Sequence, residues 1–378
     1  MNRNNGTNIC VSIPGGKFTP LNLGQMLHQT LADLGYAPVL VEDGNPVALE
    51  SDVLLLVGNG RCFNGYAKLL SNCDRTRPLT ILWLIDPLPP PHQSERGRQI
   101  GLKLAKCNWQ RIPYPLAKMV ISCLPFHHEI QKIARWMLNN KIKKDAVVNN
   151  CPEYTDIGTN QSFVLMSCLE WSKRNFEQGW IDYVFTTTIQ RKQILETIGI
   201  NAKIVPIGYH PSWGRKLSVE RDIDVLFLGD LKSKRRRSIL QDVEEKLSAK
   251  GINLVKINCG CYGEQRTALL NRAKIVLDIP RIPWEMPSMR PLMSTSCGAL
   301  LICEYVENTS PYIPGVHFVQ AKASELSNAI CYYLEHEDQR KAIVDSAYKF
   351  FTEELTLRNS ISKIMQTCNI NQTVSVLR

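Results

Sequence analysis

The sequence lacks the patterns that mark several large classes of protein. No apolar run approaches the roughly 20 residues of a membrane-spanning helix, and the polar start, MNRNNGTN, has no apolar signal-peptide core. It contains no P-loop motif GxxxxGK, and no GxGxxG follows a predicted strand. Internal repeats and low-complexity tracts are also absent. We therefore expect a globular protein of the cytoplasm.

Cysteine is frequent, but its spacing marks neither a metal site nor a redox pair. None of the 13 cysteines belongs to a CxxC pair or to a cysteine–histidine zinc pattern. Many lie in apolar segments, such as those of Cys10 and Cys303, which is typical of reduced core residues in a reducing compartment. We predict no metal site and no cofactor.

The length and the charge of the chain indicate the number of domains and the kind of ligand. The 378 residues are 44% hydrophobic, and their formal net charge is +10. Such a chain is long enough for about two domains. The charge favours an anionic small ligand, an anionic polymer or an acidic membrane surface, without choosing among them.

Near-continuous apolar strands alternate with helices in two successive series. The predicted strands lie at 8–14, 37–43, 51–59, 78–86, 182–188 and 202–208, and then at 224–229, 252–258, 274–279 and 299–303. A polar, turn-rich stretch at 210–222 separates the two series and resembles a linker. Buried strands of this kind indicate parallel sheets with helices on both faces.

We therefore predict an α/β protein of two doubly wound, Rossmann-like domains that face a cleft, because ligands of such sheets bind at the carboxyl ends of the strands. The predicted N-terminal domain covers residues 1–212, the C-terminal domain residues 213–355, and a C-terminal tail residues 356–378. Two predicted helices, 323–337 and 338–355, close the second domain.

A predicted helix at 288–297 begins with features that suit an anion. Ser288 can cap this helix, which leaves the amides of Met289 and Arg290 free to face a ligand. The forked guanidinium of Arg290 suits a phosphate. Alternatively, these residues are no more than a helix cap and a surface arginine.

Two other segments that follow strands are candidates for a phosphate site. The run KSKRRR (232–237) opens a helix directly after a strand, which is a position where diphosphates bind, but it also fits a solvated turn or a nucleic-acid patch. Gly15 and Gly16 follow the first strand. Glycine lets a backbone approach phosphate closely, although the pair also fits an ordinary turn.

The order of motifs in the second half resembles the C-terminal domain of GT-B glycosyltransferases, with the group-1-like, spore-maturation-type enzymes as the best match. The motifs are FLGDLKSKRRRSIL, LLNRAKIVLDI, RPLMSTSCGALLIC, PGVHFV and DQRKAIVDSAYKFF. The resemblance implies transfer of a sugar, hexosyl-like, from a nucleotide-sugar held by the second domain to an unknown acceptor held by the first. It also implies donor-binding roles for Gly229 and for Arg235, which matches the family's basic residue by its distance from that glycine. Helix N-termini and cations can neutralise the diphosphate leaving group without a metal.

The sequence departs from the family pattern at Met293, where a glutamate that binds the donor ribose is common. The resemblance then leaves three alternatives: Glu285 or Glu304 recognises the ribose, the donor differs, or the protein is an inactive relative that only binds. A non-catalytic binding or regulatory protein is therefore the main rival function, and a nucleic-acid-binding protein is a weaker one. The expected partners are a nucleotide-sugar, an acceptor and a peripheral membrane surface, but no nucleic acid.

Asp86 is the first candidate for a catalytic base. It ends the apolar strand TILWLID, where a carboxylate can face the cleft and deprotonate an acceptor hydroxyl. It can equally cap the following turn, and His127, His128 and His210 are weaker candidates. Asp222 and Asp224 spell DxD, the metal-binding signature of a different glycosyltransferase fold, but they precede their strand, which is the wrong end for a ligand.

Overall fold

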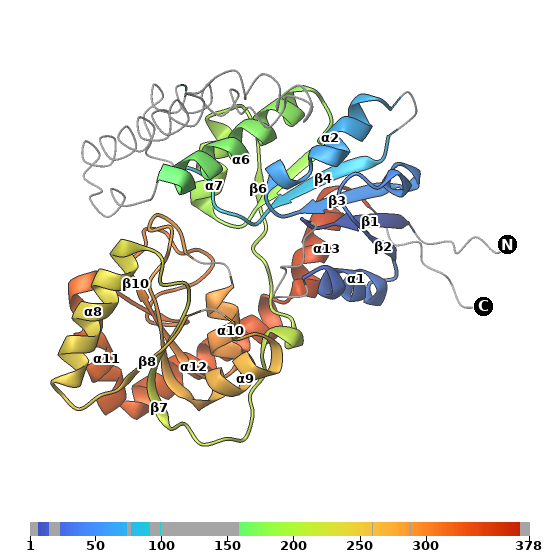
Figure 1. Ribbon diagram of the computed structural model, residues 1–378. Helices are drawn as coiled ribbons and strands as arrows, with labels where there is room; N and C mark the ends of the chain where they lie inside the picture. The colour runs from blue at the N-terminus through green and yellow to red at the C-terminus, as the bar shows by residue number, and fades with distance from the viewer. Residues whose placement is uncertain are drawn as a thin grey trace, which may run out of the picture.

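The structure, a computed structural model, has two parallel β-sheets, each packed between helices (Figure 1). It describes residues 7–14, 23–73, 77–90, 99, 159–258, 260–286 and 289–370. The first sheet comprises β1 (Asn8–Ser12), β2 (Ala37–Val41), β3 (Val53–Val57), β4 (Leu79–Leu84), β5 (Tyr183–Thr186) and β6 (Lys203–Ile204). The second comprises β7 (Ile223–Leu228), β8 (Leu254–Ile257), β9 (Ala273–Asp278), β10 (Leu300–Glu304) and β11 (Val319–Ala321). The predicted α/β class with two doubly wound domains is confirmed.

Alternate residues of the first sheet fill two separate cores. The helices of this domain are α1 (Leu23–Asp33), α2 (Asn64–Ser71), α6 (Thr159–Glu177), α7 (Ile189–Glu196) and α13 (Leu357–Thr367). Val53, Leu55 and Val57 of β3 pack on the face that α1 and α13 cover, whereas Leu54 and Leu56 pack on the face that α2 and α6 cover. Successive side chains of a strand point to opposite faces, so an unbroken apolar strand serves both cores.

The second domain repeats this plan. Its helices are α8 (Lys234–Ser248), α9 (Gly263–Arg272), α10 (Arg290–Ser296), α11 (Leu326–Glu335) and α12 (Glu337–Lys349), which a π-helical turn (Phe350–Glu354) extends. Short 3₁₀ helices lie at Pro46–Glu50, Gly60–Cys62, Pro211–Trp213 and Ala323–Glu325. In Figure 1, α8 and α11 cover one face of the sheet, and α9 and α10 lie on the other.

Both sheets have the same topological switch point. The strand orders are β2-β1-β3-β4-β5-β6 and β11-β10-β9-β7-β8, and every pairing is parallel. In each sheet the order reverses beside its first strand, between β1 and β3 and between β7 and β9. A crevice opens at the carboxyl ends of the strands at such a point, so the gap between β7 and β9 is where a ligand is expected.

The chain crosses between the domains at two places that touch each other. The amide of Tyr209 donates to Leu355 O at 2.7 Å, and the amide of Leu357 donates back to Tyr209 O at 2.7 Å. Beyond this crossing, α13 returns to the first domain and lies beside α1 (Figure 1). Residues 356–378 were predicted as a C-terminal tail; Leu357–Thr367 of this range form α13, in which Ile361 and Ile364 are fully buried.

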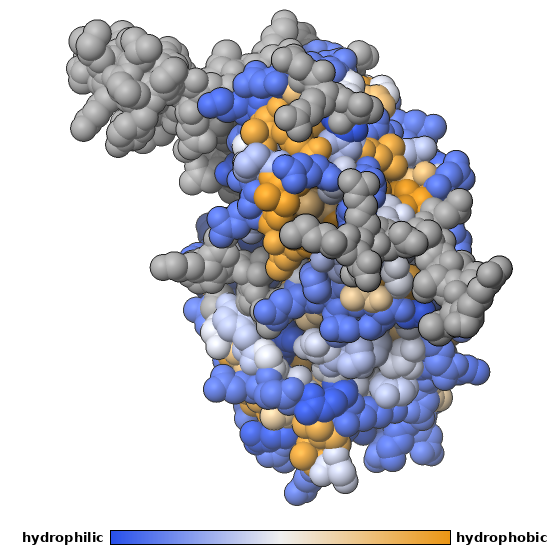
Figure 2. Space-filling view, turned by 90° about the vertical axis from the view of Figure 1, so that its right-hand side faces the viewer, coloured by the Kyte–Doolittle hydropathy of each residue, from blue (hydrophilic) through white to orange (hydrophobic). Residues whose placement is uncertain are grey.

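The face of the molecule in Figure 2 is mainly hydrophilic, and conspicuous apolar areas lie on the upper, N-terminal domain. The exposed apolar side chains of the described residues include Val39 and Leu40 of the edge strand β2. None of the helices in the described part of the chain is both long and apolar enough to cross a membrane. Contact with a membrane surface stays a prediction.

Candidate functional site

A cavity of about 440 Å³ lies between the two domains. Ile85, Pro87 and Arg191 of the first domain line one side. The other side consists of the carboxyl ends of β7, β8 and β9 with the loops that follow them. The cavity therefore occupies the switch point that the strand order indicates.

Positive charge dominates the cavity lining. Five arginines and two carboxylates line it: Arg191, Arg236, Arg266, Arg281, Arg290, Asp278 and Glu285. The rest of the lining is largely apolar and includes Leu228, Met289 and Met293. A ligand that is anionic along part of its length and apolar or neutral elsewhere matches this distribution.

Arg290 joins the two strands of the switch point. Its Nη1 donates to Leu228 O at the end of β7, and its Nε lies 3.6 Å from Asp278 Oδ1 at the end of β9. The Asp278 side chain is 2% exposed. Gly229 lies next to this group: an added Cβ would lie 3.4 Å from Arg236 Nη1 and 3.5 Å from Arg290 Nη2. Glycine thus keeps space open between two arginines.

The start of α8 turns Arg236 toward the cavity. Ser233 caps this helix by accepting from the Arg236 amide at 3.3 Å. The Arg236 guanidinium lies over the ring of Phe227 and donates to Ile279 O at 2.9 Å and to Asp230 O at 2.8 Å. Burial lowers the pKa of Arg236 from its ordinary value. These bonds hold the Arg236 guanidinium beside the carboxyl end of β7.

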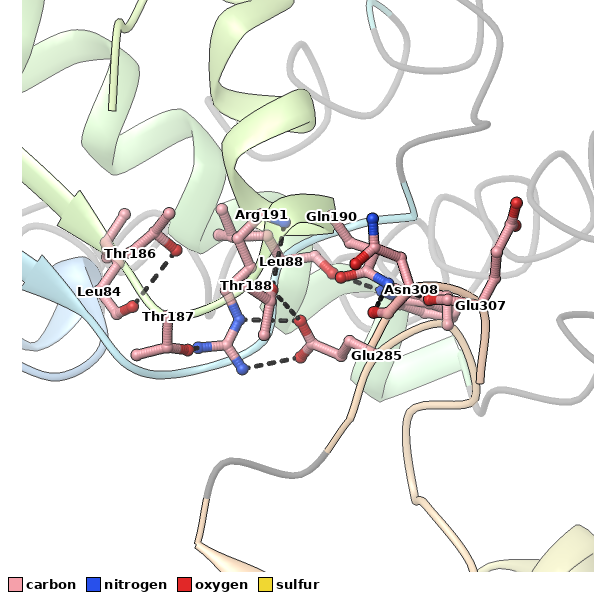
Figure 3. Close-up of polar contacts among 11 residues, drawn as sticks. Leu84, Leu88, Thr186, Thr187, Thr188, Gln190, Arg191, Glu285, Glu307 and Asn308 are labelled. Carbon is pink, nitrogen blue, oxygen red and sulfur yellow. Dashed lines mark hydrogen bonds and ion pairs between the residues drawn. The ribbon is translucent and has the colours of Figure 1, made fainter. Parts of the chain in front are cut away.

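A buried ion pair connects the domains beside the cavity. Arg191 of α7 donates from Nε and Nη2 to the two carboxylate oxygens of Glu285, at 2.8 and 2.9 Å, and both side chains are 3% exposed. Arg191 Nη1 also donates to Thr187 Oγ1 at 2.6 Å, and Thr188 Oγ1 donates to Glu285 at 3.3 Å. Figure 3 shows these side chains converging on the carboxylate from the first domain.

Further contacts fasten the segments after β9 and after β10 to the first domain. Trp284 is 1% exposed, packs in the core of the first domain and donates from Nε1 to Leu88 O at 3.2 Å. The side-chain amide of Gln190 donates to the backbone carbonyls of Glu307 and Asn308 (Figure 3). One wall of the cavity is therefore held by the opposite domain.

Comparison with known proteins gives one family match and several matches of fold. The family model described as glycosyl transferase-like matches residues 234–366, which lie mainly in the C-terminal domain. The whole chain has the fold of HepE from Anabaena in complex with UDP-glucose, with a TM-score of 0.53 and 9% identity over 96% of this chain and 99% of that one. The complex of HepE with UDP gives a TM-score of 0.52 and 8% identity over the same shares. No curated protein sequence matches at a significant level.

The two domains therefore have the GT-B fold, and the cavity lies between them. Four of the predicted donor-site residues line it together: Gly229, Glu285, Met289 and Arg290. Helix α10 begins at Arg290, and Met289 occupies its N-cap position without a side-chain bond. Gly15, Gly16 and Ser288 lie outside the described residues, as do His127 and His128.

Arg235 and Glu304 pair with each other instead of lining the cavity. Arg235 Nη2 donates to Glu304 Oε1, and Arg235 Nη1 donates to Pro280 O at 3.3 Å. Arg235 was predicted to bind the donor, whereas the structure turns its neighbour Arg236 to the cavity. Adjacent residues of a helix point about 100° apart, so a shift of one position changes which arginine faces the ligand.

Asp86 lies between two cavity-lining residues, Ile85 and Pro87, and is itself half-buried. Burial raises the pKa of its carboxyl from the ordinary value, while Arg191 and Arg281 lower it and Glu285 raises it. Asp86 is thus in the electrostatic field of the cavity. His210, a weaker candidate, caps the turn at 211–213 through its Nδ1, and burial lowers its pKa.

The DxD aspartates are far along β7 from the cavity. Asp222 forms a bidentate pair with Arg272 at 2.8 and 2.6 Å, and Asp224 pairs with Lys274 at 2.7 Å. Asp222 immediately precedes β7 and Asp224 is its second residue, whereas the cavity adjoins the carboxyl end of this strand. Within the described ranges, no group of three or more His, Cys, Asp and Glu side chains is placed to hold a metal ion.

Several residues that line the cavity were not predicted from the sequence as site residues: Arg191, Arg236, Arg266, Asp278 and Arg281. Asp278 has a local signal, because it is a carboxylate at the end of an apolar strand. Arg191 has no signal that relates it to Glu285, which is 94 residues away in the chain. Only the fold brings those two together.

Proposed function

We propose that this protein transfers a glycosyl group from a nucleotide-sugar to an acceptor. The observation that carries the proposal is the arginine-rich cavity between the two domains of a GT-B fold. A nucleoside diphosphate is the leaving group of such a transfer, and preorganised cations stabilise the negative charge that develops on it. HepE, which has the same fold, was crystallised with UDP-glucose, so a uridine diphosphate sugar is the first donor to test.

We assign the donor side and the acceptor side of the reaction to different residues of the cavity. Arg290 and Arg236 face the diphosphate, and Gly229 leaves room for it. Glu285, held by Arg191, presents a fixed carboxylate to donor hydroxyls. Asp86 lies on the acceptor side, where it serves as base if the reaction inverts the anomeric centre. Retention needs no strong base from the enzyme, and the choice between the two stays open.

The reaction is proposed to need no metal ion, because the arginines supply the positive charge that a metal would bring. Hexosyl transfer, the spore-maturation subtype and a cytoplasmic location are finer predictions of the same hypothesis. Turnover should persist in excess chelator. Activity that disappears in chelator and returns on adding magnesium or manganese would contradict metal independence and reopen Asp222 and Asp224.

The test of the proposal is a panel of nucleotide-sugars. Ligands that bind the native state raise its melting temperature by mass action, so thermal shift first selects the donor. Transfer to a broad acceptor panel, or slow donor hydrolysis, is then measured for the parent and for Arg290→Ala. We expect the parent to react and the variant to bind the nucleoside diphosphate more weakly by about 1.5–3 kcal/mol.

A non-catalytic binding protein is the second candidate, and Met293 favours it. This thioether lines the cavity at the position where related enzymes commonly have a ribose-binding glutamate. A parent protein that binds a nucleotide-sugar, yet neither transfers nor hydrolyses it, would decide for this candidate. Binding to nucleic acid with steep salt dependence would instead support the weaker rival.

A further inference from the structure

Arg266 is a buried cation that faces the cavity with little to compensate its charge. It belongs to α9, lines the cavity and is 5% exposed. Its Nη2 donates to Trp213 O at 3.2 Å, and its Nε is buried without a hydrogen-bond partner. Among the described residues, no carboxylate forms an ion pair with it.

The other arginines of the cavity have a carboxylate, carbonyl acceptors or water as partners. Arg191 has the Glu285 carboxylate, Arg290 has Asp278, and Arg236 donates to two carbonyls. Arg281 is exposed to water. A guanidinium keeps its proton in proteins, and a buried charge without a partner is strongly unfavourable. Among the described arginines of the cavity, Arg266 therefore differs in having a buried Nε without an acceptor.

The carboxylates nearest to Arg266 are paired with other arginines: Glu264, in the first turn of α9, pairs with Arg215, and Asp278 pairs with Arg290. Burial lowers the pKa of Arg266, Cys297 and Cys261 raise it, and the nearby charge of Arg290 lowers it. Helix α9 has ten residues, and its N-cap, Tyr262, makes no side-chain capping bond. Gly260, Cys261 and Tyr262, which lead into α9, line the cavity. The positive end of a helix dipole thus adjoins the same buried cation.

We propose that Arg266 and the N-terminus of α9 bind a phosphoryl group of the donor's diphosphate, together with Arg290. This inference rests on the proposed function and adds a second cation to its diphosphate site. A phosphate between Arg266 and Arg290 relieves the repulsion of the two guanidiniums. It also supplies the acceptor that Arg266 lacks. A neutral nucleobase would supply acceptors without the compensating charge.

Calorimetric titration of inorganic pyrophosphate and of the uridine, guanosine, cytidine and adenosine diphosphates tests this. Arg266→Gln should weaken pyrophosphate and all four nucleotides by a similar factor, roughly 10- to 100-fold. The control Arg237→Gln removes an arginine that bonds Leu231 O and Lys232 O outside the cavity lining, and it should leave all affinities near those of the parent.

The unliganded proteins supply a second readout. If Arg266 serves a ligand, ligand-free Arg266→Gln should melt at or above the temperature of the parent, because an uncompensated charge has been removed. A purely structural arginine would lower the melting temperature and leave pyrophosphate affinity unchanged. Arg266→Lys, which keeps a charge, should bind pyrophosphate more tightly than Arg266→Gln.

Several results would overturn the inference. Unchanged pyrophosphate affinity in Arg266→Gln is one, and equal affinity of the Lys and Gln variants is another. A loss confined to some nucleotides, with pyrophosphate unaffected, would assign Arg266 to the nucleobase instead. A parent protein that binds neither pyrophosphate nor any nucleotide would overturn the proposed function as well, which separates the two failures.

Discussion

Asp86 combines a raised pKa with a place beside the cavity. A general base must be deprotonated to act, and burial raises the pKa of this carboxyl from its ordinary value. If Asp86 is the base, turnover should fall as the pH drops through that raised pKa. Asp86→Asn should then cut turnover by roughly 10²- to 10⁴-fold with donor affinity nearly unchanged. Steady-state rates against pH check this, and a small effect would indicate retention or another base.

The raised pKa of Asp86 should also make stability depend on pH. Stability should fall as the pH rises, whereas turnover should fall as the pH drops. Because the pKa is raised in the folded state, the folded protein binds this proton more tightly than the unfolded chain does. Protonated Asp86 therefore makes its full contribution to stability below the pKa that it has in the unfolded chain. This contribution is lost as the pH rises through the pKa that Asp86 has in the folded protein. Asp86→Asn should raise the melting temperature at pH values above this window and change it less below. An equal shift on both sides would argue against a buried ionised carboxylate.

At the scale of elements, the start of α8 decides which basic residue meets the donor. Three consecutive arginines occupy its first turn, and the structure directs Arg236, not Arg235 or Arg237, to the cavity. We predict that Arg236→Gln weakens nucleoside diphosphate binding more than Arg237→Gln, as measured by titration. Arg235→Gln should mainly lower stability, because it leaves Glu304 without this partner. If Arg237 is the most sensitive, the register of this helix is different.

The crossing of two backbone segments between the domains depends on Gly208. A Cβ at this position would lie 2.0 Å from Thr356 O and 2.1 Å from Thr356 C, so the backbone would have to move. Gly208→Ala should therefore destabilise the protein by at least roughly 1–3 kcal/mol in urea unfolding. Gly251→Ala is the control, because Gly251 has a φ of 74° but open space around it, and it should cost only about 1–2 kcal/mol. Equal losses would show that the crossing tolerates a side chain.

At the scale of the whole molecule, the Arg191–Glu285 pair holds the domains together across the cavity. Removing one partner leaves the other charge buried, which costs about 3–5 kcal/mol. Arg191→Ala and Glu285→Ala should each destabilise the protein, and the double variant should lose much less than their sum. Urea unfolding of all four proteins checks this. Small-angle scattering should show a larger radius of gyration for Arg191→Ala if the pair keeps the domains closed, and additive losses would contradict the coupling.

Local pattern predicted most of the secondary structure. The predicted strand 274–279 corresponds to β9 and the predicted helix 323–337 to α11, because apolar runs and helix signals act over a few residues. Helix α13 was not predicted, because its buried face is completed by α1, which lies more than three hundred residues earlier. The site was predicted in the same uneven way: Gly229 directly follows a predicted strand and Arg290 lies at the start of a predicted helix, but no local pattern relates Arg191 to the cavity.

The sequence by itself determined the α/β class, the division into two sheets and a preference for an anionic ligand. Strand periodicity, glycine positions and net charge are properties of neighbouring residues or of the whole composition, so no coordinates are needed to derive them. The tertiary structure alone decided which of three arginines on α8 faces the cavity, which carboxylate restrains Arg191 and which described arginine of the cavity has a buried Nε without an acceptor. These depend on side-chain direction and on contacts between residues far apart in the chain. Burial makes those contacts important for stability, because a charge that has lost its hydration is unfavourable unless another group in the folded protein pairs with it.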